Sequence, residues 1–282
     1  MCKQEFKWKK LLKLILEIKF YDFLFYTIFL FSGYTPFSIG EFYKTFFSTS
    51  FNFGKNFPAT FIVLYVLIPY INIFIKHLTH KEFNNLLIIL LTIFSGLSMC
   101  SLHVEMITWY IVVYLIGAYL RLYPHPSFNN RKKMALLAVG SLLLSWLSIA
   151  ALVVFFHYIK MGNYYYYFVS NSNHILSIST AVAFFLFFKS IKMPTSRIIN
   201  KIATATFGVL LIHGNSAAMR HFIWGDIFRN VDFVNSNYLW LHAFTAVMVV
   251  YLICVVIDLL RIQLLEKPLF KLINKKCPVY LK

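Results

Sequence analysis

Residues 131–156 read RKKMALLAVGSLLLSWLSIAALVVFF, three basic residues followed by an apolar run without a charged side chain. A run of this length and hydropathy is long enough to cross a bilayer as a helix. Seven more apolar stretches occur along the 282 residues, at about 14–34, 57–75, 85–101, 104–120, 174–190, 202–219 and 238–260. The sequence therefore predicts an all-α fold, a polytopic transmembrane bundle of about eight spans.

The basic residues alternate between the loops that join these stretches. With the N-terminus taken as cytoplasmic, one set of loops and ends holds 22 of the 27 Lys and Arg residues. The other set holds five, namely Lys44, Lys55, Lys160, Arg220 and Arg229. Because short cytoplasmic loops are enriched in Lys and Arg, this asymmetry predicts that both termini are cytoplasmic.

The composition excludes several classes of protein. Hydrophobic residues make up 60% of the chain, charged residues make up 13%, and the mean hydropathy is +0.69, all outside the range of soluble domains. The net charge of +17 sits in short loops, where it faces anionic lipid headgroups, and no groove-reading motif accompanies it. The four cysteines lack metal-ligand spacing. We therefore expect the lipid bilayer as a partner, no nucleic acid and no metal.

The chain reads as one integral membrane domain over residues 1–282. Residues 1–19 are predicted to include a basic amphipathic helix on the cytoplasmic leaflet, residues 20–260 the bundle, and residues 261–282 a basic cytoplasmic tail. Charged residues interrupt the region that a secretory signal would keep apolar, which argues against a cleaved signal: Lys13, Glu17, Lys19 and Asp22.

Polar residues inside the apolar stretches are costly in a bilayer and need an explanation. Asp258 and Arg261 are three residues apart, so they share a helical face and are predicted to form a structural ion pair. Asn72 follows Pro69, and it either satisfies the carbonyl that the proline frees or lines a polar path.

The seventh stretch is the most informative for chemistry. The helix predicted over this stretch places His213 and Arg220 two turns apart on one face, near the outer side together with Asn215 and Trp224. Such a cluster is suited to hold a sugar, with the indole stacking and the guanidinium donating hydrogen bonds. The alternative is plain interfacial anchoring.

Four stretches resemble the acyltransferase 3 family of membrane O-acetyltransferases, which modify bacterial cell-surface polysaccharides. They are PYIN at 69–72, WYIVVYLIGAYLRLYP at 109–124, NKI at 200–202 with FGV at 207–209 and His213, and DLLR at 258–261 with EKP at 266–268. They occur in the family's order over nearly the whole chain.

The resemblance implies a bacterial cytoplasmic-membrane enzyme that moves an acetyl group from cytoplasmic acetyl-CoA to a hydroxyl of a cell-surface or exported glycan. It implies about ten helices, so we expect a further helix pair, with the main catalytic base, upstream of Met1. Within this chain the catalytic candidates are His213 and Glu105. The candidates for acceptor binding are Asn215, Arg220, Trp224 and His103, and those for CoA phosphates are Arg121, Arg131 and Lys132.

Two other functions stay open at this point. The first is a fragment or membrane partner without catalysis of its own, and the second is a subunit of a glycolipid transporter or flippase. The second shares the polytopic form, but no internal repeat is visible in the sequence. Dependence on acetyl-CoA separates the enzyme from both.

Overall fold

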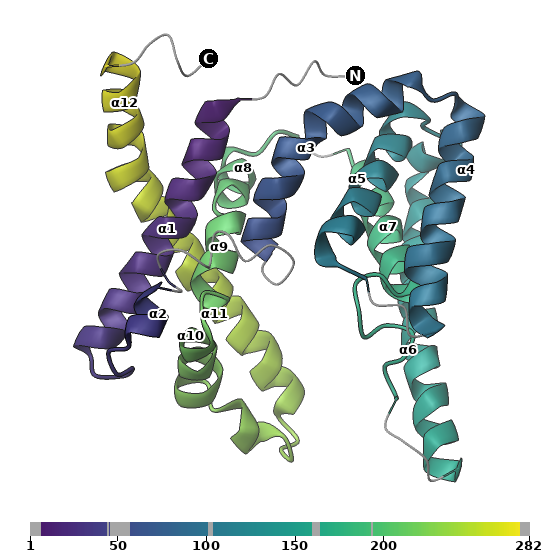
Figure 1. The fold of residues 1–282 in the computed structure, drawn as a ribbon. Coiled ribbons are helices and arrows are strands. Elements are labelled where there is room, and N and C mark those ends of the chain that lie inside the picture. The colour runs from purple at the N-terminus through teal and green to yellow at the C-terminus, as the bar shows by residue number, and fades with distance from the viewer. Residues whose placement is uncertain are drawn as a thin grey trace. The chain divides into compact units, whose positions relative to one another are not determined.

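The computed structural model describes residues 7–43, 45, 57–100, 104–159, 164–192 and 194–276, and most of these residues are helical. Within these ranges there is no β-strand, which confirms the all-α prediction (Figure 1). Among the described residues, four helical segments are long and apolar enough to cross a membrane: Phe57–His77, His80–Met99, Arg131–Ile159 and Leu239–Ile273. A bent pair of helices brings the number to as many as five. The count of eight spans and the side on which the termini lie stay predictions.

The helices follow the predicted apolar stretches closely. The segment α3 (Phe57–His77) is followed by α4 (His80–Leu91), which continues through the π-helical turn η2 (Thr92–Gly96) and the 3₁₀ turn η3 (Leu97–Cys100). Next come α5 (Met106–Leu122), η4 (Pro126–Asn129), α6 (Arg131–Ile159) and α7 (Ile175–Ser190). Two predicted spans, those of α5 and α7, are apolar but shorter than the others.

The N-terminal region is one continuous helix. The predicted interfacial helix and the first predicted span together form α1 (Trp8–Phe31), which is followed by the short α2 (Ile39–Tyr43). Its first half is not wholly exposed, since Leu11, Glu17 and Ile18 are buried.

The prediction of one helix across 202–219 is wrong. The chain instead forms α8 (Arg197–Thr204), α9 (Thr206–His213), α10 (Ala217–His221) and the π turn η5 (Phe222–Ile227), with a bend of 96° between α9 and α10. The cause is local. Gly214 ends α9, and Ser216 adopts an extended conformation as the N-cap of α10, where its Oγ accepts a hydrogen bond from the Met219 N–H.

The C-terminal part begins with the 3₁₀ turn η6 (Asn230–Phe233) and continues as one long helical segment. This segment consists of α11 (Leu239–Arg261), the π turn η7 (Ile262–Glu266) and α12 (Lys267–Lys276). It contains the predicted span 238–260.

The described residues divide into two compact units. Unit 1 lies within residues 66–194 and contains most of α3 with α4 to α7. Unit 2 lies within residues 4–65 and 195–282 and contains α1, α2, the start of α3 and α8 to α12.

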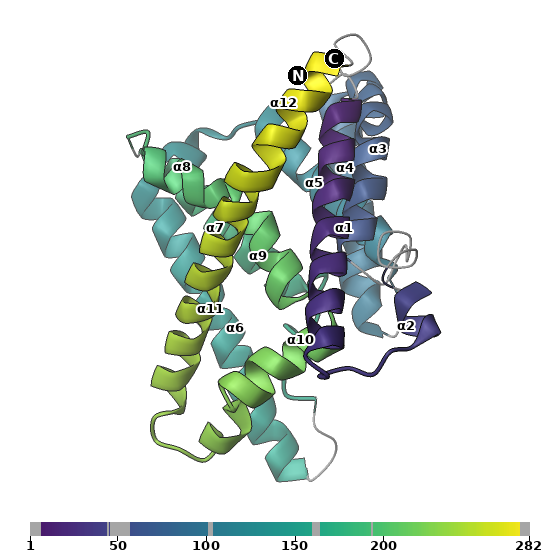
Figure 2. The same ribbon diagram turned by 90° about the vertical axis from the view of Figure 1, so that its left-hand side faces the viewer.

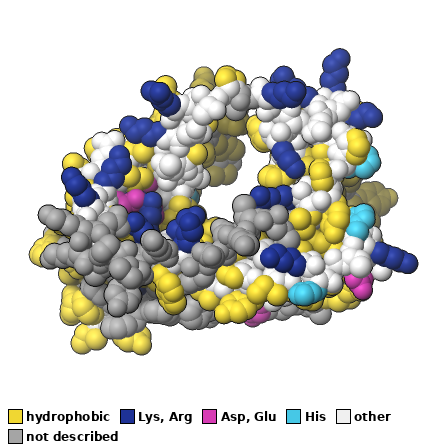
Figure 3. All heavy atoms as spheres, turned by 90° about the horizontal axis from the view of Figure 1, so that it is seen from above, with side chains coloured by type: hydrophobic (Ala, Val, Ile, Leu, Met, Phe, Trp, Pro, Cys, Tyr) yellow, Lys and Arg dark blue, Asp and Glu magenta, His cyan; other side chains and the backbone are white. Residues whose placement is uncertain are grey.

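In unit 1 consecutive helices run in alternating directions (Figure 1). Its core is formed by Ile75, Phe83, Leu87 and Leu115. The end at which α4 and α6 begin carries the basic residues predicted to be cytoplasmic, and Figure 3 looks onto it, with Lys and Arg side chains projecting.

In unit 2, α9 packs between α1 and α11 (Figure 2). The buried side chains at this junction come from all three helices, with Ile18 and Tyr21 from α1, Val209 from α9, and Val250 and Cys254 from α11.

The core of unit 1 gives a direct test of the packing. Phe83 is fully buried, so Phe83→Ala is expected to lower the free energy of unfolding by about 3–5 kcal/mol through lost burial and the cavity left behind. Phe188→Ala is the matched control, because that ring is 64% exposed. Denaturant titration in detergent micelles measures the free energy of unfolding of both variants. An equal loss of this free energy in the two variants would contradict the placement of Phe83 in the core.

Candidate functional site

The break between α9 and α10 opens the backbone at a place where the sequence predicts a membrane span. The Gly214 N–H still bonds the Leu210 carbonyl at 3.0 Å, and the Arg220 guanidinium donates to the Gly214 carbonyl at 3.4 Å. Irregular backbone at membrane depth is tolerated where it is buried in protein or lines a polar cavity. The break is therefore a natural place to look for a binding site.

A cavity of about 340 Å³ lies beside this break, within unit 2. Its volume is at the lower end of the range for small-molecule sites. The residues that line it come from α1, α3, α9 and α10 and from the break itself: Ile18, Asp22, Phe57, Pro58, Leu210, Leu211, Gly214, Asn215, Ser216, Ala217 and Arg220.

The Asp22 carboxylate is the most deeply placed charge in this cavity. Asp22 is only 8% exposed, and its Oδ1 accepts a hydrogen bond from the Asn215 Nδ2 at 3.3 Å. Its Oδ2 lies 3.7 Å from the Lys19 Nζ. A buried carboxylate needs such partners, because an unpaired one costs several kcal/mol. The cavity thus offers an acceptor from Asp22 close to the Asn215 amide.

The structure brings together two of the residues predicted to bind the acceptor. Asn215 and Arg220 both line the cavity, although they lie on either side of the bend and not along one helix. Trp224 does not line it; its ring packs against Phe228 at 5.9 Å.

His213 does not line the cavity either. Its Nδ1 lies 2.6 Å from the Val209 carbonyl, so this nitrogen carries the proton that it donates there. In the neutral ring that leaves Nε2 as the unprotonated atom. Because α9 ends at His213, the predicted shared face with Arg220 does not exist, and that prediction is wrong.

The remaining predicted residues belong to unit 1 or lie outside the described residues. Glu105 is the N-cap residue of α5, and His103 falls in 101–103, which the structure does not describe. Arg121, Arg131 and Lys132 are exposed near η4, at the end of α5 and the start of α6.

Asp22 was not among the site residues predicted from the sequence. The signal was present, since Asp22 is an acidic residue inside the apolar stretch 14–34. An ionisable residue inside a membrane span is a functional candidate by default. What the sequence could not reveal is the partner, because Asn215 lies 193 positions away.

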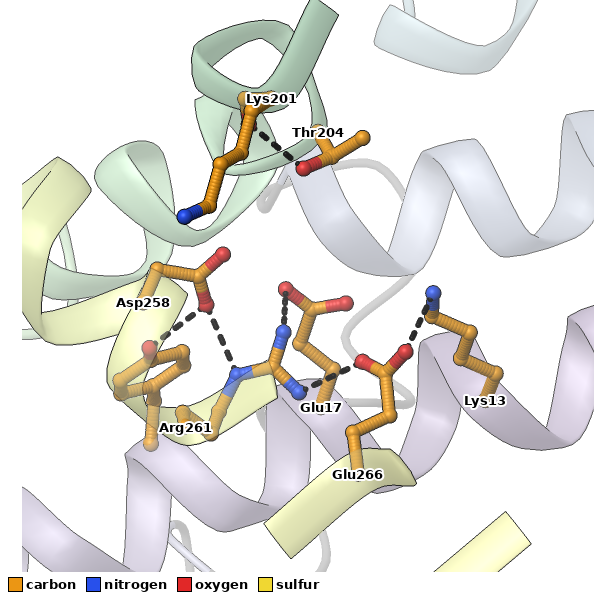
Figure 4. Close-up of polar contacts among 8 residues, drawn as sticks. Lys13, Glu17, Lys201, Thr204, Asp258, Arg261 and Glu266 are labelled. Carbon is orange, nitrogen blue, oxygen red and sulfur yellow. Dashed lines mark hydrogen bonds and ion pairs between the residues drawn. The ribbon is translucent and has the colours of Figure 1, made fainter. Parts of the chain in front are cut away.

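Beside the cavity, one arginine holds three carboxylates (Figure 4). Arg261 donates to Asp258 at 2.7 Å, to Glu17 at 2.8 Å and to Glu266 at 3.0 Å. The predicted Asp258–Arg261 pair is thereby confirmed, but it is part of a larger network that joins α1 to α11 and η7. We call these four residues the Arg261 network.

Two further side chains complete this arrangement. Tyr21 donates its hydroxyl to Asp258 at 2.7 Å, and the Arg261 guanidinium lies 5.6 Å from the centre of the Tyr21 ring. Lys13 pairs with Glu266 at 2.6 Å. The buried charges are therefore held by several partners at once, as low-dielectric surroundings require.

Gly208 of α9 gives the Asp258 side chain its space. A Cβ built at Gly208 would lie 2.2 Å from the Asp258 Cγ, closer than two non-bonded carbon atoms can approach. The carboxylate of α11 thus rests directly against the backbone of α9, and only glycine allows this.

Within the described ranges, no group of three or more His, Cys, Asp or Glu side chains is placed to hold a metal ion. Comparisons with known protein families, with curated proteins and with solved structures found no match. The acyltransferase 3 resemblance therefore rests on the four sequence stretches alone.

Loss of the central arginine is expected to be severe. Arg261→Met removes the shared partner of three carboxylates, and breaking a buried pair costs about 3–5 kcal/mol. The control is Arg229→Met, since the pair of Arg229 with Asp232 at 2.6 Å is well exposed and contributes little. Thermal unfolding in detergent compares the two variants, and similar midpoints would contradict the role of the network.

The contact between Gly208 and Asp258 gives a second stability test. Gly208→Ala is expected to destabilise the protein despite the better helix propensity of alanine, because the methyl group collides with the Asp258 carboxylate. Gly140→Ala in α6 meets nothing within 4 Å and is expected to be neutral or stabilising by up to about 1 kcal/mol. If Gly208→Ala also proved neutral, the close approach would be disproved.

Proposed function

We propose that the protein is a membrane-embedded acyltransferase that moves an acetyl group from cytoplasmic acetyl-CoA to a hydroxyl of a glycan. The observation that carries the proposal is the polar cavity at the broken helix, where Asp22, Asn215 and Arg220 come together in unit 2. The resemblance of four ordered stretches to the acyltransferase 3 family supplies the reaction class.

The cavity suits an acceptor alcohol. The Asn215 amide and the Arg220 guanidinium are donors to sugar oxygens, and the Asp22 carboxylate accepts from a sugar hydroxyl. Leu210, Leu211 and Pro58 add apolar surface for the carbon face of a sugar ring. A few convergent polar groups on an otherwise apolar lining are typical of small-molecule sites.

The chemistry needs a base and a donor for the developing oxyanion. The acceptor hydroxyl oxygen attacks the thioester carbonyl, its proton passes to the base, and CoA leaves as the thiol. The resemblance implies that the main base is a histidine. Within the chain the candidates stay His213, whose Nε2 is the free acceptor of the neutral ring, and Glu105 at the start of α5.

The acyl donor is proposed to contact unit 1. Arg121, Arg131 and Lys132 are exposed near η4, and Lys189 from the end of α7 donates to the Leu120 carbonyl at 3.5 Å. Four cationic side chains at one end of this unit suit the phosphates of CoA. If that end faces the cytoplasm, as the positive-inside rule predicts, acetyl-CoA reaches it directly.

The proposal includes a topology of eight spans with both termini cytoplasmic, in a bacterial cytoplasmic membrane. It is supported by the alternating helix directions of unit 1, which place Lys76, Lys81, Arg121, Arg131 and Lys189 at the same end. The acceptor, a cell-surface or exported glycan or glycolipid, would then enter from the opposite side.

A glycolipid transporter or flippase is the second candidate. The broken helix beside a polar cavity favours it, because discontinuous helices form the substrate sites of many transporters. A transporter moves its substrate without acetyl-CoA, whereas the acyltransferase consumes acetyl-CoA and leaves an ester. A partner without catalysis of its own does neither.

The CoA side is tested with Arg121→Ala. In membranes from cells that express the native gene product, this change is expected to raise the KM for acetyl-CoA about tenfold, as loss of one charge-assisted hydrogen bond would. Lys81→Ala is the control at the start of α4. An unchanged KM would remove Arg121 from the donor site.

The acceptor side is tested with Arg220→Ala. We expect kcat/KM for the glycan to fall about 10–100-fold, the loss that corresponds to one or two hydrogen bonds to a charged group. The KM for acetyl-CoA should stay the same, and Arg229→Ala should change neither. A rise in the acetyl-CoA KM instead would place Arg220 on the donor side.

A further inference from the structure

A second cavity, of about 280 Å³, lies within unit 1 and has no part in the proposed acceptor site. The described residues that line it include no Asp, Glu, Lys or Arg. Its polar groups and its aromatic ring come from Ser98, Trp109, Asn171, Ser172, Asn173 and His174. This lining differs in kind from the charged cavity of unit 2.

The cavity is built where three helices begin or end. The turn η3 closes α4, while α5 begins at Met106 and α7 begins at Ile175. The Asn173 Nδ2 donates to the Phe94 carbonyl and to the Ser98 Oγ, both at 2.9 Å, and so ties the segment before α7 to the end of α4. Phe94 lies in the π turn η2, a type of turn that is frequent at functional sites.

The histidine of this cavity is buried and contacts two neutral side chains. His174 is 6% exposed, with its Nε2 3.3 Å from the Asn171 Nδ2 and its Nδ1 3.4 Å from the Ser170 Oγ. An amide nitrogen can only donate, so Nε2 accepts and Nδ1 carries the proton that it donates to the serine. Both partners are uncharged.

These groups select the kind of ligand. A charged ligand would lose its hydration without an Asp, Glu, Lys or Arg side chain to pair with among the described lining residues, which is costly. A neutral ligand with several hydroxyls finds amide, hydroxyl and imidazole partners, and Trp109 adds aromatic surface for its carbon face. Asn171 and Ser172 are exposed, so the cavity is reached from outside the unit.

We propose that this cavity is a binding site for a neutral, hydroxyl-rich ligand of the size of one sugar ring. The site does not depend on acyl transfer, because its binding chemistry needs neither acetyl-CoA nor the residues of the unit 2 cavity.

Binding is measured on the purified full chain in lipid nanodiscs, without acetyl-CoA, by saturation-transfer NMR. The probes are the methyl glycosides of glucose, galactose and N-acetylglucosamine, with methyl glucuronide as the charged counterpart. We expect at least one neutral glycoside to bind with a millimolar Kd and the glucuronide to bind at least tenfold more weakly.

Ser172→Trp fills the mouth of the cavity at an exposed position and is expected to weaken this binding at least tenfold. Ser179→Trp places the same side chain at an exposed position of α7 outside the cavity and should bind as the unchanged protein does. Circular dichroism and the thermal midpoint verify that both variants fold.

Three results would overturn the proposal: no neutral glycoside binds, Ser172→Trp binds as well as the unchanged protein, or Asp22→Asn abolishes the signal. The last result would assign the binding to the unit 2 cavity. Failure of acetyl transfer alone would leave this site intact, since no step of the assay uses the acyl donor.

Discussion

Unit 2 depends on the guanidinium of Arg261, which holds carboxylates from three segments. Glu17 belongs to α1, Asp258 to α11 and Glu266 to η7, and all three are within 3.0 Å of one side chain. Such a group is stable only as a whole, because removal of one partner leaves buried charge uncompensated. It fixes the distance between α1 and α11 and leaves room for α9 between them, where Gly208 admits the Asp258 carboxylate.

The same network explains how the cavity gets its shape. On α1, Glu17 and Tyr21 are one turn apart and contact the residues of α11. Ile18 and Asp22 are also one turn apart, on the neighbouring face, and line the cavity. The contacts of Glu17 and Tyr21 with α11 therefore orient α1 so that Ile18 and Asp22 face the cavity at the break between α9 and α10. Glu17, which stabilises the fold, and Asp22, which is a candidate for ligand binding, thus lie on neighbouring faces of α1.

The sequence predicted what depends on local pattern. The run at 134–156 has no charged residue, so α6 was found with its ends nearly right, and the Asp258–Arg261 pair followed from a spacing of three. Hydropathy did not detect the bend after His213, because the three residues Gly214–Ser216 hardly change the mean over a span-length window. Capping signals were present there, but the apolar residues around them favoured a continuous helix.

Contacts between residues far apart in the sequence could not be predicted from the sequence alone. Glu17 and Arg261 are 244 positions apart, and Asp22 and Asn215 are 193 apart. No periodicity links such residues, and the charges on α1 read as interruptions of an apolar stretch. The prediction that His213 and Arg220 share a face was wrong for the same reason as the prediction of the span, because both assumed an unbroken helix.

The proposed acyl transfer is tested most directly by following the acetyl group across a membrane. Sealed membrane vesicles from cells that express the gene, loaded with the glycan, receive acetyl-CoA labelled with ¹³C on the outside, and mass spectrometry detects labelled ester on the glycan. An acyltransferase of the proposed kind produces labelled ester that requires the gene and is reduced at least tenfold by Asp22→Asn, with the amount of protein unchanged. Absence of label with the intact gene, or full labelling by Asp22→Asn, would contradict it.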